Sequence, residues 1–276
     1  MILLKNHNFI HRSEAKTDIE DRGYTFGDGV YEVIRIYNGA YFMLEYHLNR
    51  LQYSLNEVGI NYDVESEDLE TLLSELLNKN TIEDGAIYLQ ITRGIAPRKH
   101  PYPTNSQPEL YAYPIPVSSP KKEQEQGVHL TLVEDLRWLR CDIKSLNLLY
   151  NVMVKQKAVD SGAYEALLYR SKDHITEGSS SNFFGIKNGK VLTHPANNYI
   201  LNGITRIAVQ KICKSQGIPF VEKVLSVDEL AELDEAFIAS TTAEVVPVTK
   251  IDDVVIGDGT VGEIAKKLQA GFLQLI

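Results

Sequence analysis

The stretch Arg137-Trp-Leu-Arg-Cys-Asp-Ile-Lys144-Ser-Leu-Asn-Leu-Leu149 decides how the rest of the chain is interpreted. Its lysine, Lys144, stands among aliphatic residues. Apolar surroundings disfavour the charged ammonium form, so such an amine is available at neutral pH as a nucleophile toward carbonyl groups. The alternative is an ordinary lysine whose stem lies on apolar surface while its amine reaches water.

A second motif downstream, Thr176-Glu-Gly-Ser-Ser-Ser-Asn182, has a single acid, Glu177, beside three serines. Lysine is the side chain that forms imines with pyridoxal phosphate, and this cofactor also needs an acid at its pyridine nitrogen and donors around its phosphate. Glu177 is the candidate acid. The same segment also fits a plain turn in which the serine hydroxyls cap the local backbone.

Three further places could bind the phosphate. Gly203-Ile204-Thr205 precedes a predicted helix, so its amides and the helix dipole favour an anion, although an ordinary helix start has the same pattern. Ser240-Thr241-Thr242 ends a predicted strand and could add hydroxyl donors. Arg50 falls on an otherwise apolar helix, which fits either an anion ligand or a buried salt bridge.

A long proline-bearing loop, 94–108, carries Arg98 and His100. Loops of this length are uncommon in compact domains and are often functional. The prolines favour an extended backbone, in which alternate side chains point the same way, so Arg98 and His100 could bind one carboxylate together. The alternative is a solvated basic loop.

Composition sets the broad class. The 276 residues are 43% hydrophobic and 24% charged, which is typical of a globular protein that buries a sizeable core. The net charge of -9 argues against nucleic acid or an anionic membrane as a partner. No apolar run has the length of a membrane span and the N-terminus lacks a signal-peptide pattern, so we expect a cytoplasmic protein. Cys141 and Cys213 lack metal-ligand spacing and are expected to be buried thiols.

The order of predicted elements is mixed, which favours an α+β fold over regular alternation. Asn38-Gly39 between two apolar runs predicts a type I′ hairpin. The prolines and charges from 114 to 125 predict a boundary, giving domains 1–116 and 126–276 with a linker at 117–125. Helices are predicted near 48–58, 66–77, 148–161, 205–216 and 262–276, and Ser226-Val-Asp-Glu229 has the spacing of a capping box that begins a further helix. Strands are predicted near 31–37, 40–44, 86–92, 109–113, 128–133, 165–169, 182–187, 190–193 and 236–240.

Taken together, these segments resemble the fold type IV family of pyridoxal-phosphate enzymes, and within it the D-amino-acid aminotransferases. The resemblance runs from about Asp21 to the C-terminus. It is carried by blocks at 21–33, 92–94 with Arg98 and His100, 137–149, 176–185, 193–197 and 240–242. It implies an α+β protein of two domains with the cofactor in the cleft between them.

The resemblance also implies a role for each candidate residue. Lys144 is expected to form the imine with the cofactor and to act as catalytic base and acid, with Glu177 at the pyridine nitrogen. The loop with Arg98 and His100 is expected to reach the site from a partner subunit, which implies a homodimer. Leu201 is expected to pack against the ring; Arg50, Ile204, Thr205 and Thr241 to bind the phosphate; and Tyr31, Arg98 and His100 to bind the substrate α-carboxylate.

The reaction that the resemblance implies is reversible amino transfer from a D-amino acid, typically D-alanine, to a 2-oxo acid, typically 2-oxoglutarate, giving pyruvate and D-glutamate. Two enzymes of the same fold are alternatives: a branched-chain L-amino-acid aminotransferase and 4-amino-4-deoxychorismate lyase. A non-catalytic cofactor-binding protein is a third, and it would not need Arg98 or His100.

Overall fold

The chain forms two compact units in a computed structural model that describes residues 1–276. The first unit contains residues 1–118 and 143–147, and the second contains 119–142 and 148–276. The domain boundaries expected from the sequence differ from these two units in two respects. Residues 143–147 join the first unit because Ser145 bridges to Val30 and the Tyr31 amide donates to the Lys144 carbonyl. The expected linker, 117–125, includes most of a short helix, α4 (Lys121–Gln126).

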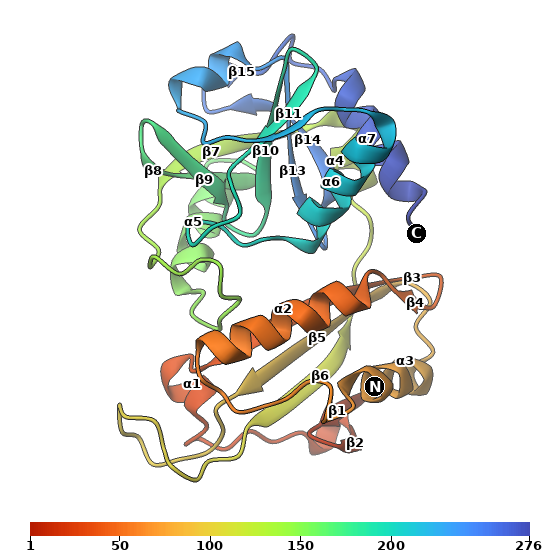
Figure 1. The fold of residues 1–276 in the computed structure, drawn as a ribbon, viewed down its shortest axis with the longest axis vertical. Helices are drawn as coiled ribbons and strands as arrows, with labels where there is room; N and C mark the ends of the chain where they lie inside the picture. Colours follow the sequence, from red (N-terminus) through yellow and green to blue (C-terminus); the bar gives the residue numbers. More distant parts are fainter. The chain divides into compact units, whose positions relative to one another are not determined.

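The first unit is a six-stranded antiparallel sheet with two helices packed against it (Figure 1). The strand order is β2-β1-β6-β5-β3-β4. Leucines recur at helical spacing on the two helices and meet the buried side chains of β3 and β5 in one core. The elements are β1 (Ile2–Lys5), β2 (Asn8–His11), a 3-10 turn (Arg12–Glu14), α1 (Arg22–Phe26), β3 (Gly29–Tyr37), β4 (Ala40–Tyr41), α2 (Leu44–Glu57), α3 (Leu69–Asn80), β5 (Gly85–Thr92) and β6 (Glu109–Ile115).

The second unit is a nine-stranded mixed sheet, ordered β12-β11-β10-β13-β14-β7-β8-β9 with β15 paired to β14. Helices α6 and α7 lie side by side in Figure 1, and α5 packs beside β7 and β8. The elements after α4 are β7 (Val128–Glu134), α5 (Leu149–Asp160), β8 (Glu165–Ser171), β9 (His174–Gly178), β10 (Asn182–Lys187), β11 (Lys190–Thr193), α6 (Ile204–Gln216), β12 (Phe220–Glu222), a 3-10 helix (Asp228–Glu232), β13 (Glu235–Ser240), β14 (Glu244–Ile251), β15 (Val254–Val255) and α7 (Glu263–Leu273).

Most predicted elements are present. Asn38 and Gly39 have φ of 50° and 74°, as the predicted type I′ turn requires. The capping box is formed, since the Ser226 hydroxyl accepts from the Glu229 amide and the Glu229 carboxylate accepts from the Ser226 amide. Cys141 and Cys213 are buried free thiols, as expected, and burial raises the pKa of each to about 11.

Several elements differ from the prediction. Helix α3 begins at Leu69 instead of near 66, because Asp68 adopts a left-handed φ of 49° just before it. Strands β1, β2, β9, β12, β14 and β15 were not predicted. Glu177 lies on β9 and not in a turn. None of the helices is both long and apolar enough to span a bilayer.

Gly94, at the start of the loop 94–108, cannot accept a side chain. Its φ is +95°, and a Cβ would lie 1.8 Å from the Gln107 carbonyl oxygen. We predict that Gly94→Ala lowers the free energy of unfolding by at least about 3 kcal/mol, because backbone strain and overlap with a carbonyl add.

Gly189→Ala is the matched control, since Gly189 also has a positive φ, +72°, but nothing within 4 Å of its Cβ position. Its cost should be about 1 kcal/mol, from left-handed strain alone. Urea unfolding of both variants measures the difference. Equal losses would mean that the contact with Gln107 carries no cost.

Candidate active site

Lys144 is anchored through its main chain to the first unit. Its carbonyl accepts from the Tyr31 amide at 3.0 Å on β3, and its amide donates to the Ser54 hydroxyl at 3.2 Å on α2. Ile143 on one side is buried in the core of this unit, whereas Leu149, which the sequence also placed among the apolar neighbours, is exposed at the start of α5. The lysine backbone is therefore held on both sides by regular elements.

The Lys144 side chain lies over an aromatic ring. Its Nζ is 4.2 Å from the centroid of the Tyr31 ring, and Tyr31 in turn stacks against Tyr88 at 5.8 Å. An amine over a ring face has one side covered, and its position is restrained by the ring. The structure thus brings together two of the predicted site residues, Lys144 and Tyr31.

Arg50 pairs with a buried acid, Glu32 on β3. Its Nε donates to Glu32 Oε1 and its Nη2 to Oε2, both at 2.7 Å. His47 Nδ1, one turn earlier on α2, lies 2.7 Å from the same Oε2. The buried salt bridge considered for Arg50 is therefore present; binding of a phosphate by Arg50 remains a proposal.

These contacts shift two pKa values. Burial alone would raise the pKa of Glu32, but Arg50 and His47 outweigh it and lower that pKa to about 2. Burial lowers the pKa of His47, against the opposing effect of Glu32. Glu32 is therefore ionised at neutral pH and is the counterion of Arg50.

Arg98 and His100 lie in the loop 94–108, and both are exposed. Both side chains approach the Phe26 ring, with the Arg98 guanidinium 4.9 Å and the His100 ring 5.5 Å from its centroid. They therefore share one aromatic neighbour, and the loop keeps a cation and an imidazole in the same region of the first unit.

Glu177 in the second unit has donors at both of its oxygens. Arg137 Nη1 donates to Oε1 at 2.7 Å, and Asn182 Nδ2 donates to Oε2 at 2.9 Å. The Leu201 amide lies 3.2 Å from Oε1 and 3.1 Å from Oε2. Burial raises the pKa of Glu177 to about 6, although Arg137 opposes this shift.

Arg137 joins Glu177 to a second acid. Its Nε and Nη2 each donate to Asp135, at 2.9 Å, so one guanidinium holds two carboxylates. Its own pKa is raised: burial lowers it, and Glu177 and Asp135 outweigh that effect. The arrangement keeps Glu177 at a fixed place on β9.

The start of α6 lies beside the side-chain amide of Asn182, which donates to Glu177. Gly203, its N-cap residue, approaches Asn182 so closely that a Cβ would lie 2.2 Å from Asn182 Oδ1. No side chain caps this helix, and both Ile204 and Thr205 are buried in its first turn. Helix amides without a side-chain cap, next to a buried hydroxyl residue, suit an anion.

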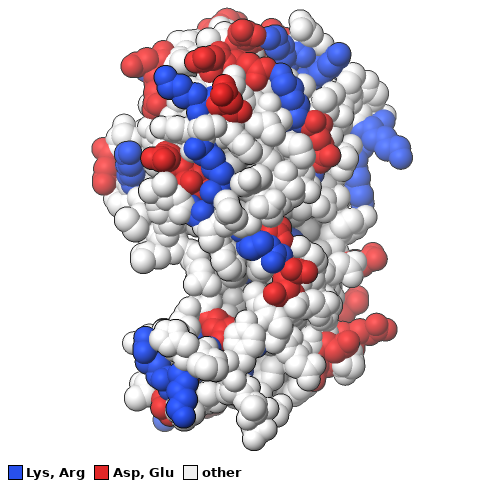
Figure 2. Space-filling view, turned by 60° about the vertical axis from the view of Figure 1, so that its left-hand side comes forward, with Lys and Arg blue, Asp and Glu red and all other residues white.

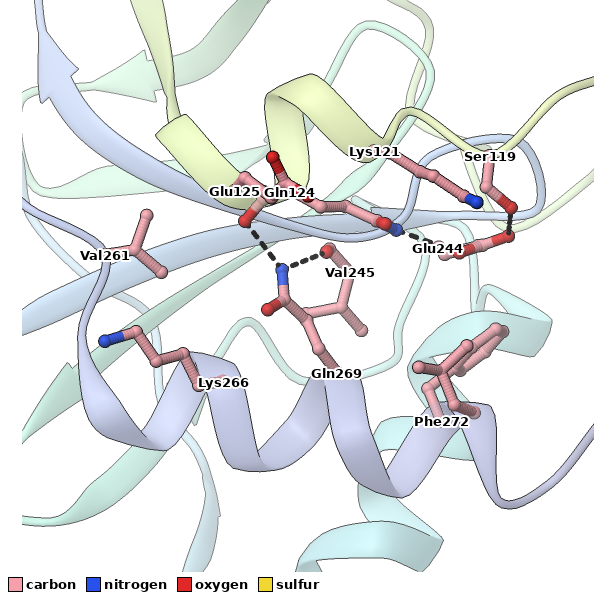
Figure 3. A pocket seen from close by; sticks show the side chains of 11 residues that line it. Ser119, Lys121, Gln124, Glu125, Glu244, Val245, Val261, Lys266, Gln269 and Phe272 are labelled. Atoms are coloured by element: carbon pink, nitrogen blue, oxygen red, sulfur yellow. Dashed lines mark hydrogen bonds between the residues drawn. The ribbon is translucent and has the colours of Figure 1, made fainter.

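Thr241 lies in the turn between β13 and β14, and the next strand anchors that turn. Glu244, buried and with a φ of 57°, accepts from the Ser119 hydroxyl at 2.6 Å and from Gln124 Nε2 at 2.8 Å (Figure 3). Gln269 on α7 donates to the carbonyls of Gln124 and Val245. These residues border a cavity of about 460 Å³, and no predicted site residue lines it.

The sequence patterns assigned no role to Glu32, His47, Arg137 or Asn182. A detectable signal existed for the first two: an arginine on an apolar helix needs a buried acid, and His47 is one turn before Arg50. Arg137 and Asn182 stand at the edges of quoted motifs. Asn182 contacts Glu177 within one quoted motif and Arg137 contacts Asp135 two residues away, but the pairing of Arg137 with Glu177 joins two separate motifs and no local pattern indicated it.

Comparison with known families and proteins fits this geometry. The model of the family Amino-transferase class IV matches residues 29–251. The chain therefore belongs to the class IV aminotransferases.

Individual proteins narrow the comparison. The chain is 51% identical over 269 residues, 98% of this chain and 95% of the other, to a protein named D-alanine aminotransferase from Bacillus licheniformis. The structure is similar to a T.th. branched-chain amino acid aminotransferase with pyridoxamine 5'-phosphate, with a TM-score of 0.91, 28% identity and 99% and 93% of the two chains covered. It is also similar to 4-amino-4-deoxychorismate lyase from Pseudomonas aeruginosa, with a TM-score of 0.84, 26% identity and 94% and 95% covered.

These matches confirm the expected fold type IV class and the expected resemblance to D-amino-acid aminotransferases. The individual roles expected of the site residues are not tested by them.

The Glu32 pair predicts a pH dependence of stability. The folded-state pKa of about 2 lies below the ordinary value of 4.5. The ionised Glu32 therefore contributes about 3 kcal/mol to the free energy of unfolding by linkage. This contribution is fully present above pH 4.5 and is lost as the pH falls from there toward 2. We predict that Glu32→Gln removes this part of the acid-side loss, measured by urea unfolding from pH 7 to 3.

The variant should also be less stable at pH 7, by about 3 to 5 kcal/mol, because Arg50 loses its buried counterion. Glu75→Gln, at an exposed glutamate on α3, should follow the unaltered protein at every pH. Parallel pH curves for Glu32→Gln and the unaltered protein would show that Glu32 does not titrate as stated.

Proposed function

We propose that the protein is a pyridoxal-phosphate-dependent D-amino-acid aminotransferase, exchanging the amino group between D-alanine and 2-oxoglutarate to give pyruvate and D-glutamate. The observation that carries the proposal is the placement of Lys144, whose main chain is fixed on β3 and α2 while its Nζ lies over the Tyr31 ring. The 51% sequence identity to a D-alanine aminotransferase supports D-amino acids as the substrates.

The residues present fit the cofactor. Glu177 offers a buried carboxylate whose position is set by three donors, which suits a pyridine nitrogen that must stay protonated. The uncapped start of α6 suits a phosphate. The Ser181 hydroxyl, on the segment between Glu177 and Asn182, is buried and has no partner in the protein, so a ligand atom can satisfy it.

The bound cofactor would supply an electron-withdrawing ring that stabilises negative charge at the substrate Cα. Lys144 would hold the cofactor through Nζ and, once released by the substrate amine, would take the proton from the substrate Cα as general base and deliver it to the C4′ carbon of the cofactor as general acid. Tyr31 would restrain Nζ on one side during this transfer. Leu201 would pack on the ring, and Arg50, Ile204, Thr205 and Thr241 would hold the phosphate.

Glu177 would keep the pyridine nitrogen protonated, and its raised pKa bears on this role. At neutral pH a group with a pKa of about 6 is mostly ionised, and a positive ring nitrogen would favour that form further. Arg137 opposes the rise and also orients the carboxylate. Asn182 would orient the other carboxylate oxygen of Glu177, Oε2, through the hydrogen bond from its Nδ2.

Arg98 and His100, with Tyr31, would bind the α-carboxylate, which 2-oxo acids and amino acids share. Their contact with the same Phe26 ring supports joint action. The location of this carboxylate site decides which Cα substituent stands perpendicular to the ring, and so selects D over L. A branched-chain L-amino-acid aminotransferase or a lyase of the same fold is less well supported, since those two structures are only 28% and 26% identical to the chain.

The proposed assembly is a homodimer, in which the loop 94–108 of one subunit serves the site of the other. An apolar patch on the second unit suits contact with another copy. On α5, Leu149, Val152 and Met153 are exposed on one helix face, and Trp138 and Leu139 are exposed in the segment before it. Figure 2 shows areas without Lys, Arg, Asp or Glu between the charged side chains of the face in view.

The function is tested by a coupled assay with D-alanine and L-alanine, each with 2-oxoglutarate. We expect pyruvate from D-alanine and at least about a hundredfold less from L-alanine. Borohydride should attach the cofactor to Lys144, found by peptide mapping, and Lys144→Ala should be inactive. Faster turnover of L-alanine, or attachment at Lys155, would refute the assignment.

A hybrid dimer tests the shared site. The Lys144→Ala chain is expected to be inactive and the Arg98→Ala chain to have a raised KM for D-alanine. At a low D-alanine concentration, mixing them should restore part of the activity, because some dimers then have one intact site. Mass spectrometry of differently tagged subunits verifies the exchange. Verified exchange without restored activity would place the loop in the site of its own subunit.

A further inference from the structure

The backbone of the loop around Arg98 and His100 is held by a buried arginine. Arg22 on α1 donates from Nη1 to the Lys99 carbonyl at 2.7 Å and from Nη2 to the His100 carbonyl at 3.4 Å. Its guanidinium also lies 4.7 Å from the centroid of the Phe26 ring. The same ring that Arg98 and His100 approach is therefore in contact with the residue that holds their backbone.

Asp28 holds Arg22 together with a second arginine. Arg22 Nε donates to Asp28 Oδ2 at 2.7 Å, and Arg93 Nε lies 3.0 Å from Oδ1 and 2.9 Å from Oδ2. Arg22 and Arg93 are 3% and 6% exposed, so two cations share one carboxylate out of water. We call Arg22, Asp28 and Arg93 the Asp28 cluster.

Arg93 extends the cluster to the far side of the loop and to α2. It donates to the carbonyls of Val58 and Gly59, both at 2.6 Å, at the C-terminal end of α2. Its guanidinium lies 3.6 Å from the centroid of the Tyr102 ring. A cation at this end of the helix is also favoured by the helix dipole.

From these contacts we infer that the Asp28 cluster positions the segment 98–102 for binding of the substrate carboxylate, so that Arg22, Asp28 and Arg93 are positioning residues of the reaction. The inference rests on the proposed function for the role of Arg98 and His100. The contacts of Arg22 and Arg93 attach the segment at Lys99, His100 and Tyr102. Without them an exposed loop would sample many conformations, and binding would have to order it at a cost in affinity.

Asp28→Asn probes the cluster with almost no change in shape. An amide has one acceptor oxygen, and its NH2 group would face an arginine N–H where Asp28 now accepts. The two buried guanidinium groups would also lose their shared counterion. Asp18→Asn is the charge-matched control, because Asp18 is exposed and lies outside the cluster.

The experiment uses the cofactor-loaded protein. We expect Asp28→Asn to raise KM for D-alanine and for 2-oxoglutarate by about tenfold or more, with a smaller change in kcat, since an interaction common to ground and transition state is weakened. The cofactor absorption spectrum should be unchanged. Tryptic cleavage after Arg98 or Lys99, without substrate, should be about tenfold faster. Asp18→Asn should match the unaltered protein in all three.

Tyr102 gives a second variant that cannot fail by unfolding the core, because its side chain is 62% exposed. Tyr102→Ala removes the ring under Arg93 and should raise both KM values and the cleavage rate several-fold. Tyr102→Phe keeps the ring and should restore both toward the unaltered values.

The possible outcomes separate the inference from the function beneath it. Unchanged KM and unchanged cleavage in both Asp28→Asn and Tyr102→Ala would overturn the inference. The proposed binding of the substrate carboxylate by Arg98 would remain open to a separate test with Arg98→Ala. Faster cleavage with unchanged KM, where Arg98→Ala raises KM, would also overturn it. If Arg98→Ala leaves KM unchanged, the proposed role of the loop in binding the substrate carboxylate fails. Faster cleavage of Asp28→Asn would still support the part of the inference that the Asp28 cluster orders the segment 98–102.

Discussion

The attachment of Lys144 to β3 and α2 is the constraint on which the candidate site depends. Two main-chain hydrogen bonds, from the Tyr31 amide and to the Ser54 hydroxyl, place the lysine beside the Tyr31 ring. The neighbouring Leu146 amide adds a bond to the Gly29 carbonyl. The connection between β7 and α5 that carries Lys144, residues 135–148, is long, but these hydrogen bonds attach it to β3 and α2 at the lysine and so restrict the positions of that residue.

Buried carboxylates bound by arginines recur in both units. Glu32 pairs with Arg50 and His47, Asp28 with two arginines, and Asp135 and Glu177 share Arg137. Such pairs add little net stability, since desolvation offsets the attraction, but removing one partner is costly. Their effect is to fix directions: each carboxylate has few orientations left once bidentate or paired donors surround it.

Much of the fold was accessible from local patterns. The hairpin at Asn38-Gly39, the leucines of α2 and α3 and the capping box at Ser226 each reside in a short window, and the structure has them. Strands β1 and β14 each pair with a strand adjacent in sequence, β2 and β13, and also with a distant strand, β6 and β7; only the distant pairings lie beyond the reach of local patterns. The site followed the same rule. Arg50 could be singled out as unusual on its helix, but its partner Glu32 is fixed only by the approach of α2 to β3.

The chain enters the first unit twice, at 1–118 and again at 143–147. During synthesis, the sheet of that unit can pair its strands as soon as β6 has emerged, but its lysine segment arrives only after α4 and β7 have been made. Domains generally fold as units in order of synthesis, and contacts distant in sequence form late. On this principle Lys144 would join a sheet that is already formed, and a stalled or truncated chain ending before residue 143 would contain the strands of that sheet without the lysine.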